Sequence, residues 1–267
     1  GEQHSTVCSV SALNVLASLP FFALVWTIKH EHKARPAEPV SFKNLVEGFR
    51  FVYQNQIILG VITLDLFAVL LGGAVTILPI FADDVFHGGP GTLGWLRNAM
   101  AIGAVICAFV IAHRPPLQKA GRAMLWSVAI FGLATIIFGI ANNNCFGRWV
   151  TLPDSFWFWC AFIMLALAGA VDNISVVVRQ TLVQILTPDA KRGRVSAVNS
   201  LFIGTSNELG GFRSGIVAWL FATPTVLGSA HATGAIISPV SGGIGTILVV
   251  LAVAWMWPQI RKYGKLA

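Results

Sequence analysis

The chain has 267 residues, of which 55% are hydrophobic and 11% are charged, and its mean hydropathy is +0.74. Soluble domains carry roughly 25% charged residues, so this composition excludes an ordinary soluble fold and indicates an all-α, polytopic membrane protein. The net charge of +7 is concentrated in short clusters between apolar runs, which is typical of cytoplasmic loops rather than of a nucleic-acid-binding face.

The N-terminal region divides into an apolar span and a polar linker. Residues 6–28 are long and apolar enough to cross a bilayer, and a cationic flank follows them. Two prolines then break the chain, and from Ser41 onward apolar residues recur at helical spacing between charged ones. We therefore expect one membrane helix in residues 1–29, and a cytoplasmic linker with an amphipathic surface helix in residues 30–55.

Six further apolar runs follow in residues 56–267, which gives about seven predicted transmembrane helices. A seven-helix retinal protein needs a lysine inside a helix, whereas every lysine here lies outside the spans or at their edges. The linker sets the first helix apart from a six-helix unit, and transporters often consist of two such units built from three-helix repeats. The six spans are predicted at residues 57–81, 93–112, 123–141, 156–188, 196–221 and 235–257.

Basic residues are distributed very unevenly between the two ends of these spans. Most of the eighteen Lys and Arg residues fall in loops on one side, whereas the loops of the other side hold Arg148 alone. Because cytoplasmic loops are enriched in Lys and Arg, we expect the basic loops and the C-terminus to be cytoplasmic and the N-terminus to lie outside.

Ionisable residues inside the spans are candidates for a polar pathway, because a charge in the bilayer is costly. Asp172 and Arg179 are seven residues apart and share one helix face. We expect them to form the polar wall of a cavity or to pair with a charge on another helix during switching. Alternatively, Arg179 anchors the helix end to the headgroups. Asp65 and Glu208 are either proton-coupling carboxylates or partners in hydrogen bonds between helices. The pathway candidates are Asp65, Asp172, Arg179, Asn199, Asn207 and Glu208.

Five segments of the chain match motifs of a known family. They are DNISVVVRQTLVQILTP (Asp172–Pro188), RGRVSAVNSLFIG (Arg192–Gly204), SNELG (Ser206–Gly210), HRPPLQKAGRAML (His113–Leu125) and GGIGTILVV (Gly242–Val250). These segments resemble the major facilitator superfamily, and most of all its drug- and siderophore-exporter branch, which includes enterobactin-exporter-like and macrolide-efflux-like proteins. One departure is that Gly211 and Arg213 stand where many relatives have acidic residues.

The resemblance implies the C-terminal six-helix half of a twelve-helix transporter fold in residues 56–267. Residues 1–29 would then be the last helix of an N-terminal half whose other helices, about five, are missing. The start inside an apolar region agrees with a fragment of a longer membrane protein, and no signal peptide is recognisable.

The same resemblance implies proton-coupled efflux of an amphipathic small molecule, of the drug or siderophore class, across the bacterial inner membrane. The expected partners are the substrate, protons, the bilayer and the missing N-terminal half, with no nucleic acid. In the family a basic loop also stabilises one conformational state, so the loop bases are gating candidates as well as topology signals. These bases are Arg114, Lys119, Arg122, Arg192 and Arg194.

Motifs of other functional classes are absent from the sequence. The chain contains no HExxH, GxSxG, P-loop or dinucleotide fingerprint, so we predict neither an enzyme nor a cofactor. The four cysteines form no CxxC pair and the six histidines have no metal-ligand spacing, so we predict no metal site. A non-transporting scaffold, a receptor-like subunit and an importer of the same fold stay open as alternatives.

Overall fold

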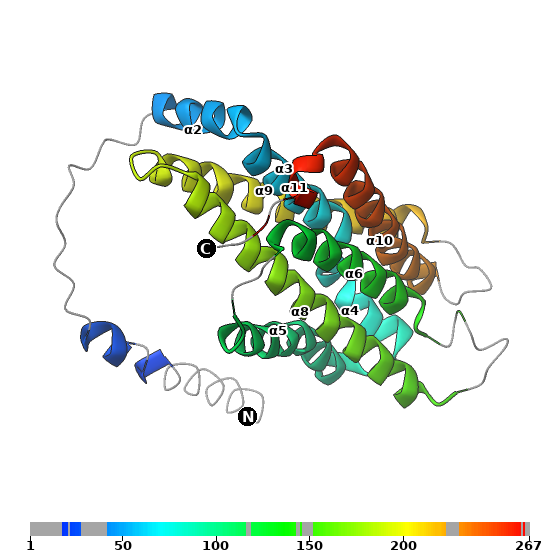
Figure 1. Cartoon of the computed structure of the whole chain (residues 1–267). Coiled ribbons are helices and arrows are strands. Elements are labelled where there is room, and N and C mark those ends of the chain that lie inside the picture. The colour runs from blue at the N-terminus through cyan, green and yellow to red at the C-terminus, as the bar shows by residue number, and fades with distance from the viewer. Residues whose placement is uncertain are drawn as a thin grey trace. The chain divides into compact units, whose positions relative to one another are not determined.

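The computed structural model describes residues 18–20, 22–27, 42–115, 119–142, 145, 152–222, 230–262 and 264, and this part of the chain is helical without strands (Figure 1). The chain divides into two compact units, Gly1–Val40 and Ser41–Ala267. In the first unit, residues 18–20 and 22–27 are helical, within the first predicted span. The rest of that span lies outside the described residues.

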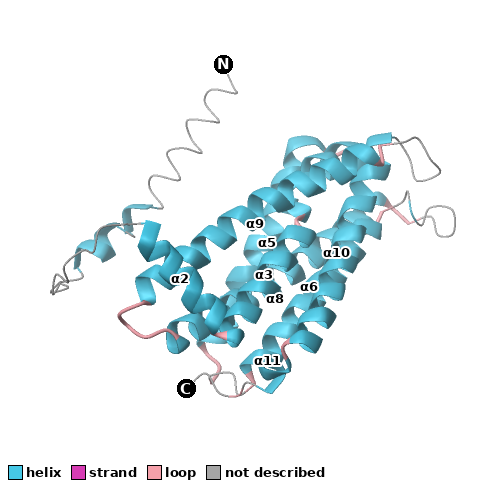
Figure 2. Cartoon of the chain, turned by 90° about the horizontal axis from the view of Figure 1, so that it is seen from above, coloured by secondary structure: helices cyan, strands magenta, loops and turns pink. Residues whose placement is uncertain are grey.

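The unit Ser41–Ala267 is a bundle of long helices that run alongside one another (Figure 2). Five helical spans in the described residues are long and apolar enough to cross a membrane, which confirms an all-α polytopic membrane fold. The helix α9 is long enough as well, but polar residues along it lower its hydropathy. The main helices are α2 (Phe42–Gln54), α3 (Gln56–Gly72), α5 (Gly89–Ala112), α6 (Ala120–Ile140), α8 (Asp154–Leu186), α9 (Arg192–Leu220), α10 (Ala230–Met256) and α11 (Pro258–Lys262).

The span predicted at residues 57–81 is interrupted rather than continuous. After α3 the chain passes through the 3-10 helix η1 (Ala74–Ile77), the short α4 (Leu78–Ile80) and the π-helix η2 (Phe81–Val85). The break starts at Gly72 and Gly73, because glycine loses more conformational freedom in a helix than other residues and so favours a kink. Polar groups of α9 hydrogen-bond to the carbonyls near the break: Arg213 Nη1 donates to Leu71 O and Ser214 Oγ donates to Gly73 O.

Glycines allow several helices of the bundle to touch backbone to backbone. A Cβ on Gly103 of α5 would overlap with the Ala166 carbonyl of α8, and a Cβ on Gly169 of α8 would overlap with the Met100 carbonyl of α5. The helices α6 and α10 approach each other in the same way through Gly132. Small residues at crossings are a common route to close packing between membrane helices.

Three apolar clusters form the core of the described bundle. The first contains Leu64 of α3, Val128 of α6 and Val178 of α8. The second includes Phe138 of α6 and Leu165 of α8, which lie towards the other end of the same two helices. The third joins α2, α3, α8 and α9 through Val52, Ile58, Val183 and Val195.

The predicted amphipathic helix is present as α2, and it packs on α9. Val52 is buried, and the ring of Phe49 lies edge-on to that of Phe202, with centroids 5.6 Å apart. Gly48 lies against the backbone of Arg194, whose guanidinium forms an ion pair with Glu47. The helix α2 is therefore part of the same compact unit as the spanning helices.

Candidate functional site

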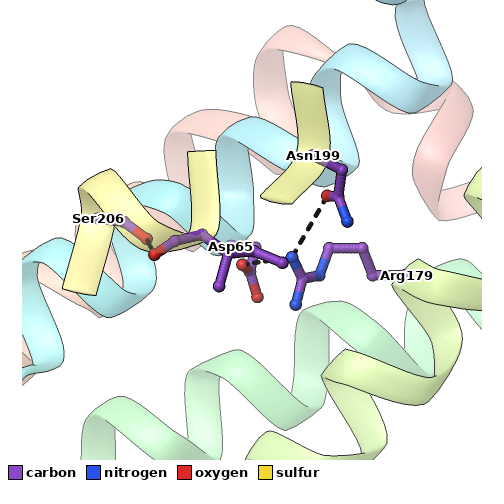
Figure 3. A network of polar contacts seen from close by, with 5 residues as sticks. Asp65, Arg179, Asn199 and Ser206 are labelled. Carbon is purple, nitrogen blue, oxygen red and sulfur yellow. Dashed lines mark hydrogen bonds and ion pairs between the residues drawn. The ribbon is translucent and has the colours of Figure 1, made fainter. Parts of the chain in front are cut away.

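A buried ion pair and a hydrogen bond connect three helices inside the bundle (Figure 3). Arg179 Nη1 of α8 lies 2.8 Å from Asp65 Oδ2 of α3, and the two side chains are 4% and 6% exposed. The same nitrogen donates to Asn199 Oδ1 of α9 at 3.4 Å. Arg179 is thus held inside the bundle and does not extend to the headgroups. An arginine stays charged in proteins, so its burial here depends on the acceptors that surround it.

Asp172 adds a second carboxylate to this group. It lies on α8, seven residues before Arg179. When both carboxylates are ionised, the group contains two negative charges and one positive charge, so its net charge is −1. A void of about 10 Å³, lined also by Ser127 and Ser175, lies between Asp65 and Asp172. Its size is about that of one water molecule.

A larger cavity of about 350 Å³ lies against the same group. Asp172 and Asn207 contribute charge and an amide to its wall, and Thr76 and Thr135 contribute hydroxyls. The other walls are mostly apolar, as is usual for small-molecule sites of this size. The lining residues are Val69, Gly72, Gly73, Val75, Thr76, Met100, Phe131, Thr135, Leu165, Ala168, Asp172, Asn207 and Gly211.

The pathway candidates from the sequence fall into three environments. Asp65, Arg179 and Asn199 are buried and connected to one another. Asp172 and Asn207 face the cavity. Glu208 is exposed on α9 and is not part of the cavity wall in the described structure.

The basic loop candidates do not form one cluster. Arg194 forms an ion pair with Glu47 of α2. Arg192 Nη2 lies 2.9 Å from Asp189 Oδ1. Arg114 is exposed at the end of α5. The remaining two, Lys119 and Arg122, line a separate hollow at the start of α6 together with Arg261.

Sequence reasoning did not foresee two of these contacts. The partner of Arg179 is Asp65, which is more than a hundred residues away in the chain, and only the packing of α3 on α8 brings them together. Arg213 holds the broken end of α3 and also donates to Ser241 Oγ of α10 at 2.8 Å. The available signal for Arg213 was its position inside a predicted span, because such a charge requires buried acceptors.

The sequence also has recognisable relatives. The family model of the Major Facilitator Superfamily matches residues 4–211, which include the helices that carry the ion pair. The chain belongs to the Major Facilitator Superfamily. This confirms the family resemblance of the sequence motifs and the multi-pass membrane fold.

Two curated relatives of the chain are named as enterobactin exporters. The enterobactin exporter EntS of Shigella flexneri is 26% identical over 202 residues, which are 74% of this chain and 43% of that protein. Its counterpart in Escherichia coli O1:K1 is 25% identical over 192 residues, or 72% of this chain and 42% of that protein. The chain thus spans less than half the length of these relatives. No solved structure matches the chain.

Proposed function

We propose that the protein is part of a secondary transporter that exports an amphipathic small molecule across a bacterial inner membrane in exchange for protons. The observation that carries this proposal is that Asp172, which lies near the buried pair of Asp65 and Arg179, also lines the cavity of about 350 Å³. Apolar walls favour an amphipathic guest, and Asp172 links the cavity to the buried pair. The exporter names of the relatives support the outward direction.

The charge balance of the group supports proton coupling. Asp65 and Asp172 line the same small void, and the group contains one guanidinium, that of Arg179, so uptake of a single proton would remove the net negative charge from a poorly solvated site. A proton on Asp172 would change the polarity of the cavity wall, whereas a proton on Asp65 would weaken the contact between α3 and α8. Either change alters the free energy of one conformation relative to another, which is the requirement for coupling.

The arrangement of the transporter follows from the same proposal. Residues 56–267 form the C-terminal six-helix half, residues 1–29 form the last helix of an N-terminal half, and residues 30–55 connect the two. The N-terminal half supplies the opposite wall of the substrate site, and the two halves rock about it. The basic loops lie in the cytoplasm, since Lys and Arg are enriched on that side of membrane proteins.

Neutralising the carboxylates in the full-length protein tests the coupling role. We expect Asp65→Asn and Asp172→Asn each to lower proton-driven efflux at least tenfold, because each removes an ionisable group next to the substrate cavity. Glu208→Gln belongs to the same test, as it is the remaining acidic pathway candidate. The measurement is export of a catecholate siderophore and of ethidium by cells that lack their own exporters.

Asp83→Asn serves as the matched control, because Asp83 is exposed and lies outside the buried group. Its efflux rate should equal that of the wild type. Full proton-driven transport by the triple variant of Asp65, Asp172 and Glu208 would contradict the coupling role. No transport of any probe by the wild type would favour a scaffold or receptor-like subunit instead.

A further inference from the structure

The short helix α11 packs against α6 (Figure 2). A basic hollow lies at the start of α6 beside α11. Its volume is about 690 Å³, and its lining contains the cationic side chains of Lys119, Arg122 and Arg261. The aromatic ring of Trp126 and the apolar side chains of Ala123 and Leu125 complete the lining. The hollow is remote in sequence from Asp172 and shares no lining residue with the substrate cavity.

Close packing fixes the two sides of this hollow relative to each other. A Cβ on Gly121 would overlap with the carbonyl oxygen of Ile260, so α11 rests directly on the first turn of α6. Ile260 is fully buried, and the Ala120 amide donates to Gly264 O at 3.2 Å. These contacts place Arg261 beside the start of α6 although the two segments are far apart in the chain.

The hollow lies at the ends of two predicted membrane crossings. One apolar span starts at Ala120 and another ends at Met256, just before α11. The side chain of Trp126 is 69% exposed and lies one helical turn beyond Arg122 on the same face. A tryptophan in that position is typical of the zone between headgroups and acyl chains, so the three cations are at headgroup level.

Two of the other loop bases have acidic partners. Arg192 pairs with Asp189, and Arg194 pairs with Glu47. Among the described residues, no acidic side chain forms an ion pair with Lys119, Arg122 or Arg261. Setting the topology requires only that basic residues lie on the correct side of the membrane. It does not require three cations to converge in one concave site beside a tryptophan.

We propose that this hollow binds the phosphate headgroup of an anionic phospholipid, with the glycerol and upper acyl chains against Trp126. The three cations would attract the negatively charged phosphate of the headgroup, and basic pockets between membrane helices are known to bind such lipids. The bound lipid would join the start of α6 to α11 at this end of the bundle. The proposal does not depend on transport activity.

Lipid binding to the full chain in a non-ionic detergent micelle tests the proposal. We expect phosphatidylglycerol to bind at least tenfold more tightly than phosphatidylcholine with the same acyl chains, as measured by native mass spectrometry. Each basic residue near an anionic headgroup contributes about fivefold in affinity. The triple variant K119Q/R122Q/R261Q should therefore lose at least tenfold in phosphatidylglycerol affinity.

A control with the same change in net charge separates a specific site from general attraction. The variant R114Q/K191Q/R192Q removes three exposed bases elsewhere, and its phosphatidylglycerol affinity should change less than twofold. Equal losses in the two triple variants, or equal binding of the two lipids, would overturn the proposal. Displacement of the lipid by millimolar inorganic phosphate at constant ionic strength would assign the site to free phosphate instead.

If the variant K119Q/R122Q/R261Q does not fold, the single variants Arg122→Gln and Trp126→Ala provide the same comparison. Arg122→Gln should weaken phosphatidylglycerol binding about fivefold and leave phosphatidylcholine binding unchanged. Trp126→Ala should weaken the binding of both lipids, since the ring contacts the part that they share. An unchanged phosphatidylglycerol affinity in both single variants would contradict the proposed site.

Discussion

At the scale of single residues, the ion pair of Asp65 and Arg179 allows two charged side chains to be buried inside the bundle. Each side chain is almost fully buried, and each is the nearest opposite charge of the other. Removal of Arg179 leaves the Asp65 carboxylate without its partner in an apolar environment, whereas removal of both members removes that unpaired charge. Asp172 remains in either case, so the double replacement keeps the net charge of the group at −1.

Replacement of Arg179 by methionine should therefore lower the free energy of unfolding by about 3 kcal/mol. The double variant Asp65→Asn/Arg179→Met should recover at least half of that loss. The reason is that the Asp65 carboxylate, which Arg179→Met leaves unpaired, is absent from the double variant. Unfolding in mixed detergent micelles, followed by circular dichroism, measures both changes. A double variant as unstable as Arg179→Met alone would show that the arginine stabilises the fold through contacts other than the pair.

At the scale of helices, the crossing of α5 and α8 depends on two reciprocal glycines. Gly103 faces the Ala166 carbonyl and Gly169 faces the Met100 carbonyl, so the two backbones are in contact where the helices cross. These neighbours are backbone atoms, which cannot move aside as a side chain can. The crossing also lies beside Met100 and Ala168, which line the cavity of about 350 Å³. Helix separation at this point would therefore change the shape of the cavity.

A methyl group at either crossing glycine should force α5 and α8 apart. We expect Gly103→Ala and Gly169→Ala each to lower the free energy of unfolding by about 1–3 kcal/mol, as measured by unfolding in micelles. Gly94→Ala is the matched control on α5, because a Cβ at Gly94 meets no atom within 4 Å. The control should be neutral or more stable by up to about 1 kcal/mol, since alanine favours a helix. Equal effects at Gly103 and Gly94 would exclude close packing as the cause.

At the scale of the whole molecule, the distribution of charge relates the bundle to the membrane. The helix α8 has 33 residues and is roughly 50 Å long, which exceeds the apolar thickness of a bilayer. It begins next to the sparsely charged side and ends beside the basic residues that follow Thr187. The two ends of α8 should therefore lie on opposite sides of the membrane, with Pro188 on the cytoplasmic side.

Cysteine labelling tests this orientation. In a version with the four native cysteines replaced by alanine, Ser155→Cys should react with a membrane-impermeant maleimide from outside the cell. Asp189→Cys should react only after the membrane is opened, because we expect the basic loop to be cytoplasmic. Both positions are exposed in the described structure, so the side of access alone decides the result. The reverse pattern would contradict the predicted orientation.

Local sequence patterns were sufficient to predict where the long helices lie. The apolar runs from Ile57, Leu93, Ala123 and Phe156 each correspond to a helical span of the structure, because a bilayer crossing depends on the hydropathy of consecutive residues. The family membership followed from motif text and was confirmed by the match over residues 4–211. The amphipathic spacing after Ser41 likewise predicted the helix α2.

The sequence by itself thus determined the helices, the membrane class and which residues carry charge in apolar surroundings. Only the tertiary structure decided that Arg179 meets Asp65 and that Arg213 supports the break in α3. It also decided that Arg261 converges with Arg122 at one hollow. The physical reason is that hydropathy and periodicity act within one helix. Contacts between helices depend on how each helix is rotated about its axis and on where two backbones can come close. Close approach occurs at glycines such as Gly103 and Gly169, which are far apart in the chain.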